Sequence, residues 1–229
     1  GDVLYITHTD GDYQPQKLTR SGALSWALTD FSPDGGPFED IDPDETITVY
    51  AGAQTGSVTL TASSAIFNAN HVGGLFLLEQ KKNDTTLTWE AGKAVNANDL
   101  RRYDFRNYKA VNSATTGGII PTHTLGAVYD GSAGVQWTFE NAGYGWGIIT
   151  AVGSSGTTAT MTVQSQIPNG AVGSGQASTR WAFAAWSDDL GWPTHVTFFR
   201  ERLCFAKATT RQVWGSVSGD FENFRNRDA

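Results

Sequence analysis

The sequence predicts an all-β protein made of antiparallel sheets. Short runs rich in β-branched and aromatic residues recur along the chain, and polar turns separate them. Glycine is frequent, with 26 of 229 residues, and no stretch shows the signals of a long helix. Short strands joined by turns are typical of sandwiches, barrels and propellers. We expect an antiparallel β-sandwich or barrel insertion domain flanked by propeller-blade-like β-meanders at both ends.

Residues 1–30 are predicted to form the first blade-like β segment, because three short runs follow one another between polar turns. These runs are residues 2–7, residues 16–20 and the residues around Trp26 and Leu28. In the first run, Val3 and Tyr5 alternate with Leu4 and Ile6, as the residues of a strand do. Since Gly1 is not an initiator and the chain begins in a strand-like run, we expect a piece of a longer protein.

Residues 31–45 are predicted to form an acidic linker. Prolines and paired glycines there interrupt any regular structure. Asp40, Asp42 and Asp44 have the alternate spacing seen in calcium loops. The glycine and the final glutamate that such a loop needs are absent. We therefore favour a solvated linker, with a calcium site as the alternative.

Residues 46–180 are predicted to form the inserted sandwich or barrel domain. Its predicted strands are residues 46–50, 57–61, 75–78, 85–89 and 135–139. The strongest hairpin signal joins residues 146–152 to residues 157–163 across a GSSG turn. Residues 68–73 could hold one helical turn, and Asn98 could cap a short turn over residues 99–102.

Residues 181–229 are predicted to form the second blade-like β-meander. Its three strands are residues 195–199, 202–207 and 212–217, separated by short gaps. In the middle strand, Leu203 and Phe205 share one face, and Cys204 and Ala206 share the other. Because both faces are apolar or small, we expect a sheet covered on two sides, as in a propeller blade. An ordinary sandwich hairpin is the alternative.

The charge and composition argue against several classes of protein. The formal net charge is −7, which argues against a protein that binds nucleic acid non-specifically, because such binding depends mostly on lysine and arginine. No apolar run approaches the roughly 20 residues of a membrane helix, so no membrane partner is expected. Cys204 is the single cysteine, which excludes an internal disulfide.

Two stretches allow a binding function as well as a structural role. Residues 101–109 interleave basic and aromatic side chains, which can bind single-stranded nucleic acid, but the acidic surroundings favour a strand with Tyr103 and Phe105 on one face. Trp137, Tyr144 and Trp146 could form a sugar-stacking platform, or pack at a sheet corner.

The motifs of catalysis and cofactor binding are missing from the sequence. No metalloprotease, phosphate-loop or serine-hydrolase motif occurs, and the four histidines lack metal-ligand spacing. We therefore expect no catalytic residue, no metal and no cofactor. A β-rich glycoside hydrolase is the enzyme alternative, with carboxylates such as Glu90, Asp104 and Glu140, because such sites need only two carboxylates in a cleft.

The C-terminal region contains a series of short motifs. They are Trp186, the turn Gly191-Trp192-Pro193, the strand Arg202-Leu203-Cys204-Phe205, Ser216 and the turn Ser218-Gly219-Asp220-Phe221. This series resembles the tail hub or nozzle proteins of tailed bacteriophages. Residues 2–20 with Trp26 resemble another segment of the same family. The stretches NANHVGGLFLLEQ and GYGWGIITAV resemble its inserted β domain.

The resemblance implies a non-enzymatic structural component of a virion, assembled in the bacterial cytoplasm. Such a protein forms a ring with other tail subunits around the DNA exit channel, and the DNA passes without specific binding. We expect Arg200, Arg202 and Arg211 at subunit contacts, because arginine is over-represented in interface hot spots. The alternative is a carbohydrate-binding module for host-surface glycans, which would use Trp137, Tyr144 and Trp146.

Overall fold

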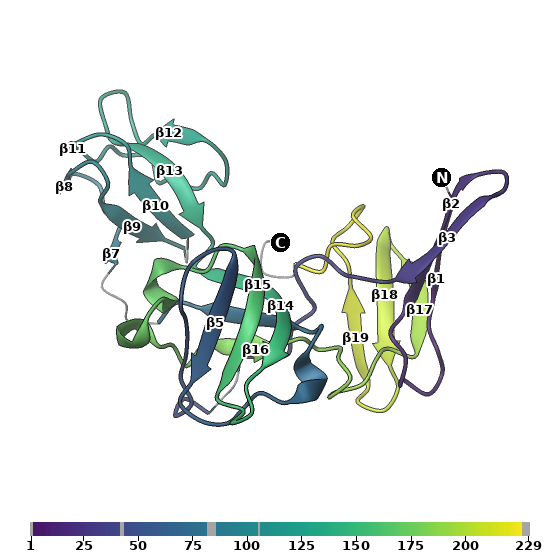
Figure 1. The fold of residues 1–229 in the computed structure, drawn as a ribbon. Coiled ribbons are helices and arrows are strands. Elements are labelled where there is room, and N and C mark those ends of the chain that lie inside the picture. The colour runs from purple at the N-terminus through teal and green to yellow at the C-terminus, as the bar shows by residue number, and fades with distance from the viewer. Residues whose placement is uncertain (1, 42–43, 82–85, 105, 226–229) are drawn as a thin grey trace.

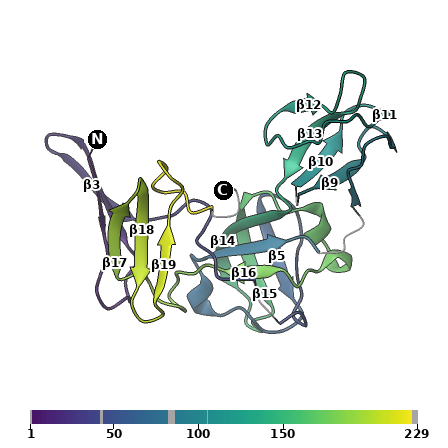
Figure 2. The ribbon, with the colours of Figure 1, turned by 180° about the vertical axis from the view of Figure 1, so that it is seen from behind.

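The computed structural model describes residues 2–41, 44–81, 86–104 and 106–225, and these residues form an all-β fold. Figures 1 and 2 show three bodies in a row. A curled six-stranded sheet lies in the middle, a small β lobe lies on one side of it, and two three-stranded sheets lie on the other. This arrangement confirms the predicted antiparallel insertion with smaller antiparallel sheets at the chain ends.

The central sheet is a half-barrel of six antiparallel strands. Its order is β16 (Trp181–Phe183), β6 (Leu75–Glu79), β14 (Tyr144–Val152), β15 (Thr158–Ser165), β5 (Ser57–Ala62) and β4 (Val49–Ala51). The β14–β15 hairpin matches the prediction from the GSSG turn, with Val152 opposite Ala159. Its register breaks twice, after Trp146 and after Ile149. Such bulges bend a strand and increase its twist, which fits the curl of the sheet.

Both faces of the central sheet are packed. The larger cluster fills the concave side and includes Leu60, Phe76, Ile149 and Met161, all fully buried. A smaller cluster on the other side contains Leu77 and Trp146. Gly145 and Gly147 face a neighbouring backbone so closely that a Cβ atom would come within 2.4 Å of a carbonyl oxygen. These two glycines therefore allow the close approach that the alternating Gly-aromatic run suggested.

The two chain ends form three-stranded antiparallel meanders that pack on each other. The N-terminal sheet contains β1 (Val3–Ile6), β2 (Gln16–Gly22) and β3 (Ser25–Asp30). The C-terminal sheet contains β17 (His195–Phe199), β18 (Arg202–Lys207) and β19 (Gln212–Gly215). The first two C-terminal strands have the bounds that the sequence predicts. Trp181–Phe183, which lies in the range predicted as the second blade, instead joins the central sheet as β16.

The small lobe is a five-stranded sheet with a two-stranded ribbon beside it. The sheet order is β12 (Ala127–Tyr129), β13 (Gln136–Asn141), β10 (Arg106–Ala110), β9 (Leu100–Tyr103) and β7 (Leu87–Thr88). The ribbon pairs β11 (Ala114–Thr115) with β8 (Ala94–Val95). The pairing of β7 with β9 is parallel, unlike the other strand pairs of the described chain.

Helical structure in the described residues is limited to short 3₁₀ turns. These turns are η1 (Ala69–His71), η2 (Asn169–Ala171) and η3 (Ser174–Gln176). The first confirms the helical turn expected in residues 68–73, with Asn68 as its N-cap. The turn expected after Asn98 is wrong: Asn98 adopts φ 73°, and strand β9 begins at Leu100. No helix among the described residues has the length and apolar character needed to span a membrane.

Candidate subunit interface

The inner faces of the two terminal sheets share one aromatic core. Tyr5 of β1 packs edge-on against Phe31, with ring centroids 5.5 Å apart, and Phe31 contacts Phe205 of β18. The Tyr5 hydroxyl donates a 3.0 Å hydrogen bond to Glu222, which also forms an ion pair with Lys17. Burial and this hydrogen bond raise the pKa of Tyr5 above its usual value. The two meanders therefore share one core.

The outer face of the N-terminal sheet carries a row of leucines. Leu4, Leu18 and Leu28 lie side by side across β1, β2 and β3. Leu4 is 56% exposed and Leu28 is 59% exposed. Next to them, the exposed Trp26 ring lies 5.5 Å from the guanidinium of Arg20. We call these five residues the leucine face. The alternation of the first strand was visible in the sequence, but the cross-strand register that aligns the leucines was not.

The middle of the outer face of the C-terminal sheet is lined by small side chains. Thr197, Cys204 and Gly215 form one row across its three strands, and Ala206 and Val213 continue the surface. Val213 is 71% exposed, and Cys204 is half-buried. We call these five residues the small-residue face. His195 lies opposite Ala206 on the same side of the sheet, and the exposed Phe199 and Arg202 lie at its end. The prediction that both sides of this sheet are covered is wrong within the described chain, because only the side with Leu203 and Phe205 is buried.

The three predicted interface arginines lie at the rim of this sheet and are exposed. Arg202 starts β18, and its guanidinium donates a 2.5 Å hydrogen bond to the carbonyl of Ser216. Arg200 occupies the tip of the β17–β18 hairpin with φ 46°, followed by Glu201 with φ 61°. Arg211 precedes β19 with φ 57°. Left-handed backbone is unfavourable for side chains other than glycine, so the β17–β18 turn holds strain that Asn-Gly would relieve.

The three aromatic residues of the glycan alternative do not form one exposed platform. Trp137 is fully buried in the small lobe, and its indole N–H donates a 2.8 Å hydrogen bond to Asp130. Trp146 is 6% exposed and packs with the half-buried Tyr144 in a different cluster. The sequence shows that these rings are near one another along the chain, but burial removes the ring faces that a sugar would stack on.

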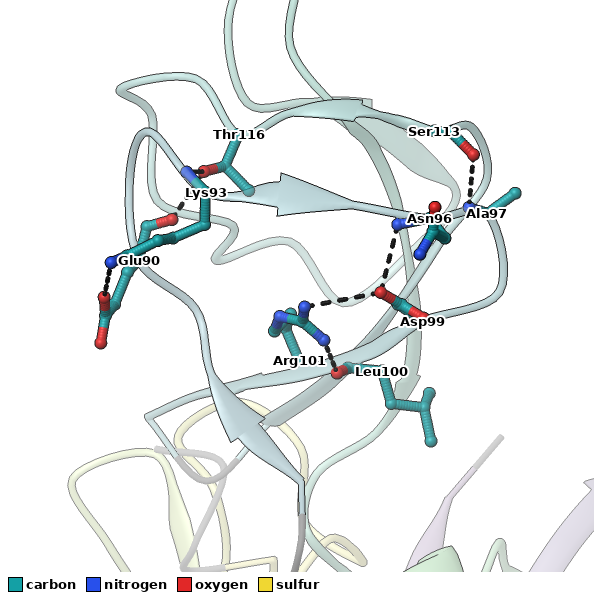
Figure 3. A network of polar contacts seen from close by, with 9 residues as sticks. All are labelled: Glu90, Lys93, Asn96, Ala97, Asp99, Leu100, Arg101, Ser113 and Thr116. Atoms are coloured by element: carbon teal, nitrogen blue, oxygen red, sulfur yellow. Dashed lines mark hydrogen bonds and ion pairs between the residues drawn. The ribbon is translucent and has the colours of Figure 1, made fainter.

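The basic and aromatic stretch, predicted as a single strand, instead forms two strands of the small lobe, β9 and β10, with a turn at Asp104; Phe105 lies outside the described residues. The guanidinium of Arg101 lies 3.5 Å from Asp99 and donates to the carbonyl of Leu100 (Figure 3). The nearby Thr116 hydroxyl donates to the carbonyl of Glu90 and accepts from the amide of Lys93 (Figure 3). The guanidinium of Arg101 is thus paired with groups of the small lobe itself.

The carboxylates considered for catalysis lie in three different settings. Glu90 pairs with Lys93 on the surface at 3.2 Å, and Asp104 is exposed in the turn between β9 and β10. Glu140 lines a cavity in which it is the single carboxylate among the described lining residues. The described chain therefore shows no pair of these carboxylates in one cleft.

The calcium alternative finds no further support in the described residues, and Asp42 lies outside them. The Asp44 carboxylate accepts hydrogen bonds from the amide and the hydroxyl of Thr46. These bonds lower the pKa of Asp44. Among the described residues, no group of three or more potential ligands could hold a metal ion.

No protein-family model matches the chain, and no curated protein is significantly similar to it.

Proposed function

We propose that this chain is a structural component of a bacteriophage tail, a subunit of the wall around the DNA exit channel that performs no reaction. The family comes from the sequence resemblance. The assembly role is supported by one observation, the two uncovered outer faces of the terminal sheets. Monomeric proteins rarely leave large apolar patches exposed, and such patches mark interaction sites.

The two faces fit a head-to-tail contact between copies. The leucine face presents large side chains, and the small-residue face presents Thr, Cys, Gly and Ala between the larger side chains of Val213, His195 and Phe199. Large side chains of one copy can pack against small ones of the next copy at close range. A contact between two different faces leaves one free face on each end, and it closes into a ring when the rotation between copies permits.

The charge of the chain suits a wall past which DNA moves. A net charge of −7 gives little attraction to phosphates, so DNA would slide without being retained. In this proposal Arg200 and Arg211 contact neighbouring tail subunits at the rim of the small-residue face. The glycan alternative has no exposed set of its three aromatics to support it.

The test is the mass of the chain in solution, measured by light scattering at two concentrations. We expect masses that are multiples of one chain and that rise with concentration. Leu28→Glu on the leucine face and Val213→Glu on the small-residue face should each give a monomer. An unpaired carboxylate buried in a contact costs several kcal/mol, which corresponds to a weakening of at least about a hundredfold.

A mixture of the two variants distinguishes a head-to-tail contact from a symmetric one. Each variant keeps the face that the other has lost, so the mixture should form a dimer and nothing larger. Leu125→Glu is the matched control, because Leu125 is 87% exposed in the small lobe and should not affect assembly. A wild-type chain that is monomeric at both concentrations, or a Val213→Glu variant that assembles alone, would overturn the proposed contact.

A further inference from the structure

A polar cavity of about 350 Å³ lies where the small lobe meets the central sheet. This volume falls at the lower end of the roughly 300–1,000 Å³ of ligand pockets. The side chains that matter for its chemistry are Asn107, Lys109, Glu140 and Asn141 from the small lobe, and Gln54 and Asn169 from the central body. Leu100 is its main apolar lining residue. Amides therefore dominate the lining, with one carboxylate and one ammonium group.

The amide of Asn107 is held in one orientation by a chain of hydrogen bonds. The amide N–H of Gly143 donates to Asn141 Oδ1 at 3.0 Å, which fixes that oxygen as an acceptor. Asn107 must therefore present its Nδ2 group, which donates to Asn141 Oδ1 at 2.8 Å and to Gln80 Oε1 at 2.7 Å. Turning any one of these amides would place two like groups in contact.

This orientation leaves one buried acceptor and one buried donor without a partner in the described chain. They are Asn107 Oδ1 and Gln80 Nε2, and both residues are only 5% exposed. A buried polar group without a hydrogen bond is costly, and native structures rarely keep one unless something else satisfies it. Asn107 also lines the cavity, but its Oδ1 atom is covered, so an occupant supplies the missing bond when a neighbouring lining side chain moves aside.

The two charged side chains of the cavity, Glu140 and Lys109, are also available to bind a ligand. Residue pairing along β10 and β13 goes from Asn107 opposite Asn141 to Tyr108 opposite Phe139, so Glu140 is the extra residue of a β-bulge. Bulges near functional sites redirect a side chain, and Glu140 is here directed to the cavity. Within the described residues, the side chains of Glu140 and Lys109 form no ion pair or hydrogen bond with each other or with a third group.

We propose that this cavity binds a neutral polyhydroxylated ligand, a mono- or disaccharide unit. A hydroxyl group both donates and accepts, so one hydroxyl can donate to Asn107 Oδ1 while its neighbours donate to Glu140 and accept from Lys109. A phosphorylated ligand fits less well, because one carboxylate offsets the single lysine. This site is separate from Trp137 and Trp146, and it is also separate from the terminal sheets proposed as the subunit contact.

The test is a titration of the isotope-labelled chain with glucose, galactose, mannose and N-acetylglucosamine, followed by side-chain amide resonances in NMR spectra. We expect at least one of these sugars to shift the Asn107 and Asn141 resonances in a saturable way. Tetrahydropyran-2-methanol, which has the sugar ring but a single hydroxyl, should shift them at least tenfold less at equal concentration. Absence of a saturable shift with every sugar would mean that water alone fills the cavity, and would overturn the proposal.

Three variants then locate the binding. Glu140→Gln keeps the size of its side chain and Lys109→Gln shortens its side chain, and each removes one charge; each should raise the dissociation constant roughly tenfold, as loss of a charged hydrogen bond does. Glu90→Gln makes the same change on the surface of the same lobe and should leave binding unaltered. If both cavity variants bind sugar as tightly as Glu90→Gln does, the sugar binds elsewhere and the assignment is wrong.

Discussion

At the scale of single residues, one buried carboxylate organises the small lobe. Asp130 is 1% exposed, and its two oxygens accept four hydrogen bonds. The indole groups of Trp89 and Trp137 donate to Oδ2, at 3.3 and 2.8 Å. The backbone amides of Gly117 and Val135 donate to Oδ1, at 2.9 and 2.7 Å. Asp130 therefore connects the core tryptophans with two loops, in a lobe whose strands are mostly short.

Replacement of Asp130 by asparagine should destabilise the small lobe. An amide has a single acceptor oxygen, so either the two indole donors or the two backbone donors would face an NH₂ group. Each buried donor left without a partner costs about 1–3 kcal/mol, and we expect a loss of about 3 kcal/mol in unfolding free energy. Urea unfolding followed by tryptophan fluorescence measures it, with the exposed Asp12→Asn as control. Equal midpoints for the two variants would contradict this role for Asp130.

The sequence had no signal for this role. Asp130 precedes a glycine and follows a strand-like Val-Tyr pair, so it resembles an ordinary turn residue. The sequence predicts a role for the ring of Trp137, whereas in the structure its indole N–H donates to Asp130. Similarly, the sequence indicates only that Glu140 is one of several carboxylates, because the bulge that directs it to the cavity depends on the register between two strands. Hydrogen-bond partners far apart in the chain cannot be read from local pattern.

At the scale of elements, the sequence predicts strands well where local pattern and packing agree. Residues 195–199 and 202–207 are predicted with their observed bounds, because runs rich in β-branched and aromatic residues are separated there by short gaps. Two-residue strands such as β8 and β11 are not predicted by the sequence, since so short a run has no detectable period. The parallel pairing of β7 with β9 was also unforeseen, because it joins strands across a connection that carries no hairpin signal.

The 3₁₀ turn η1 contains a histidine whose protonation should destabilise the fold. His71 stacks on Phe183 with ring centroids 4.0 Å apart, and its Nδ1 atom accepts a 3.0 Å hydrogen bond from the amide of Asn68. Burial lowers the pKa of His71 below 6.5, although the carboxylate of Asp189 opposes this shift. The unfolded chain therefore binds the proton more tightly than the folded chain does. Stability should be complete above pH 6.5 and should fall as the pH drops from 6.5 through the folded-state pKa.

Melting temperatures measured between about pH 7.5 and pH 5 test this prediction, since the range spans the usual histidine pKa. His71→Gln is the informative comparison, because glutamine can accept the same capping hydrogen bond and does not titrate. Titratable groups away from this site titrate equally in both proteins, so the difference between the two curves belongs to His71 and its neighbour Asp189. Two curves that fall in parallel would show that His71 does not contribute.

At the scale of the whole molecule, the sequence indicates which parts of the chain are alike but not how they pack. The two meanders at the chain ends were recognised as similar, and their shared core was not, because Tyr5 and Glu222 are 217 residues apart. The region predicted as one inserted domain contains two bodies with separate hydrophobic clusters. Their junction creates the amide-lined cavity, which neither body forms alone.

The single cysteine provides a direct measurement of assembly, because it lies in the small-residue face. Cys204 is half-exposed in one copy and would be covered if the leucine face of another copy packs there. Its reaction with a thiol reagent should slow as protein concentration rises, by about tenfold when nine-tenths of the chains are assembled, since only free chains react. Leu28→Glu should react at one rate at all concentrations. A chain with Cys204→Ser and Ser132→Cys carries its thiol at an exposed position of the small lobe, and should also react at one rate. Slowing of the relocated thiol would indicate non-specific association, whereas slowing confined to Cys204 would place the contact on the outer face of the C-terminal sheet.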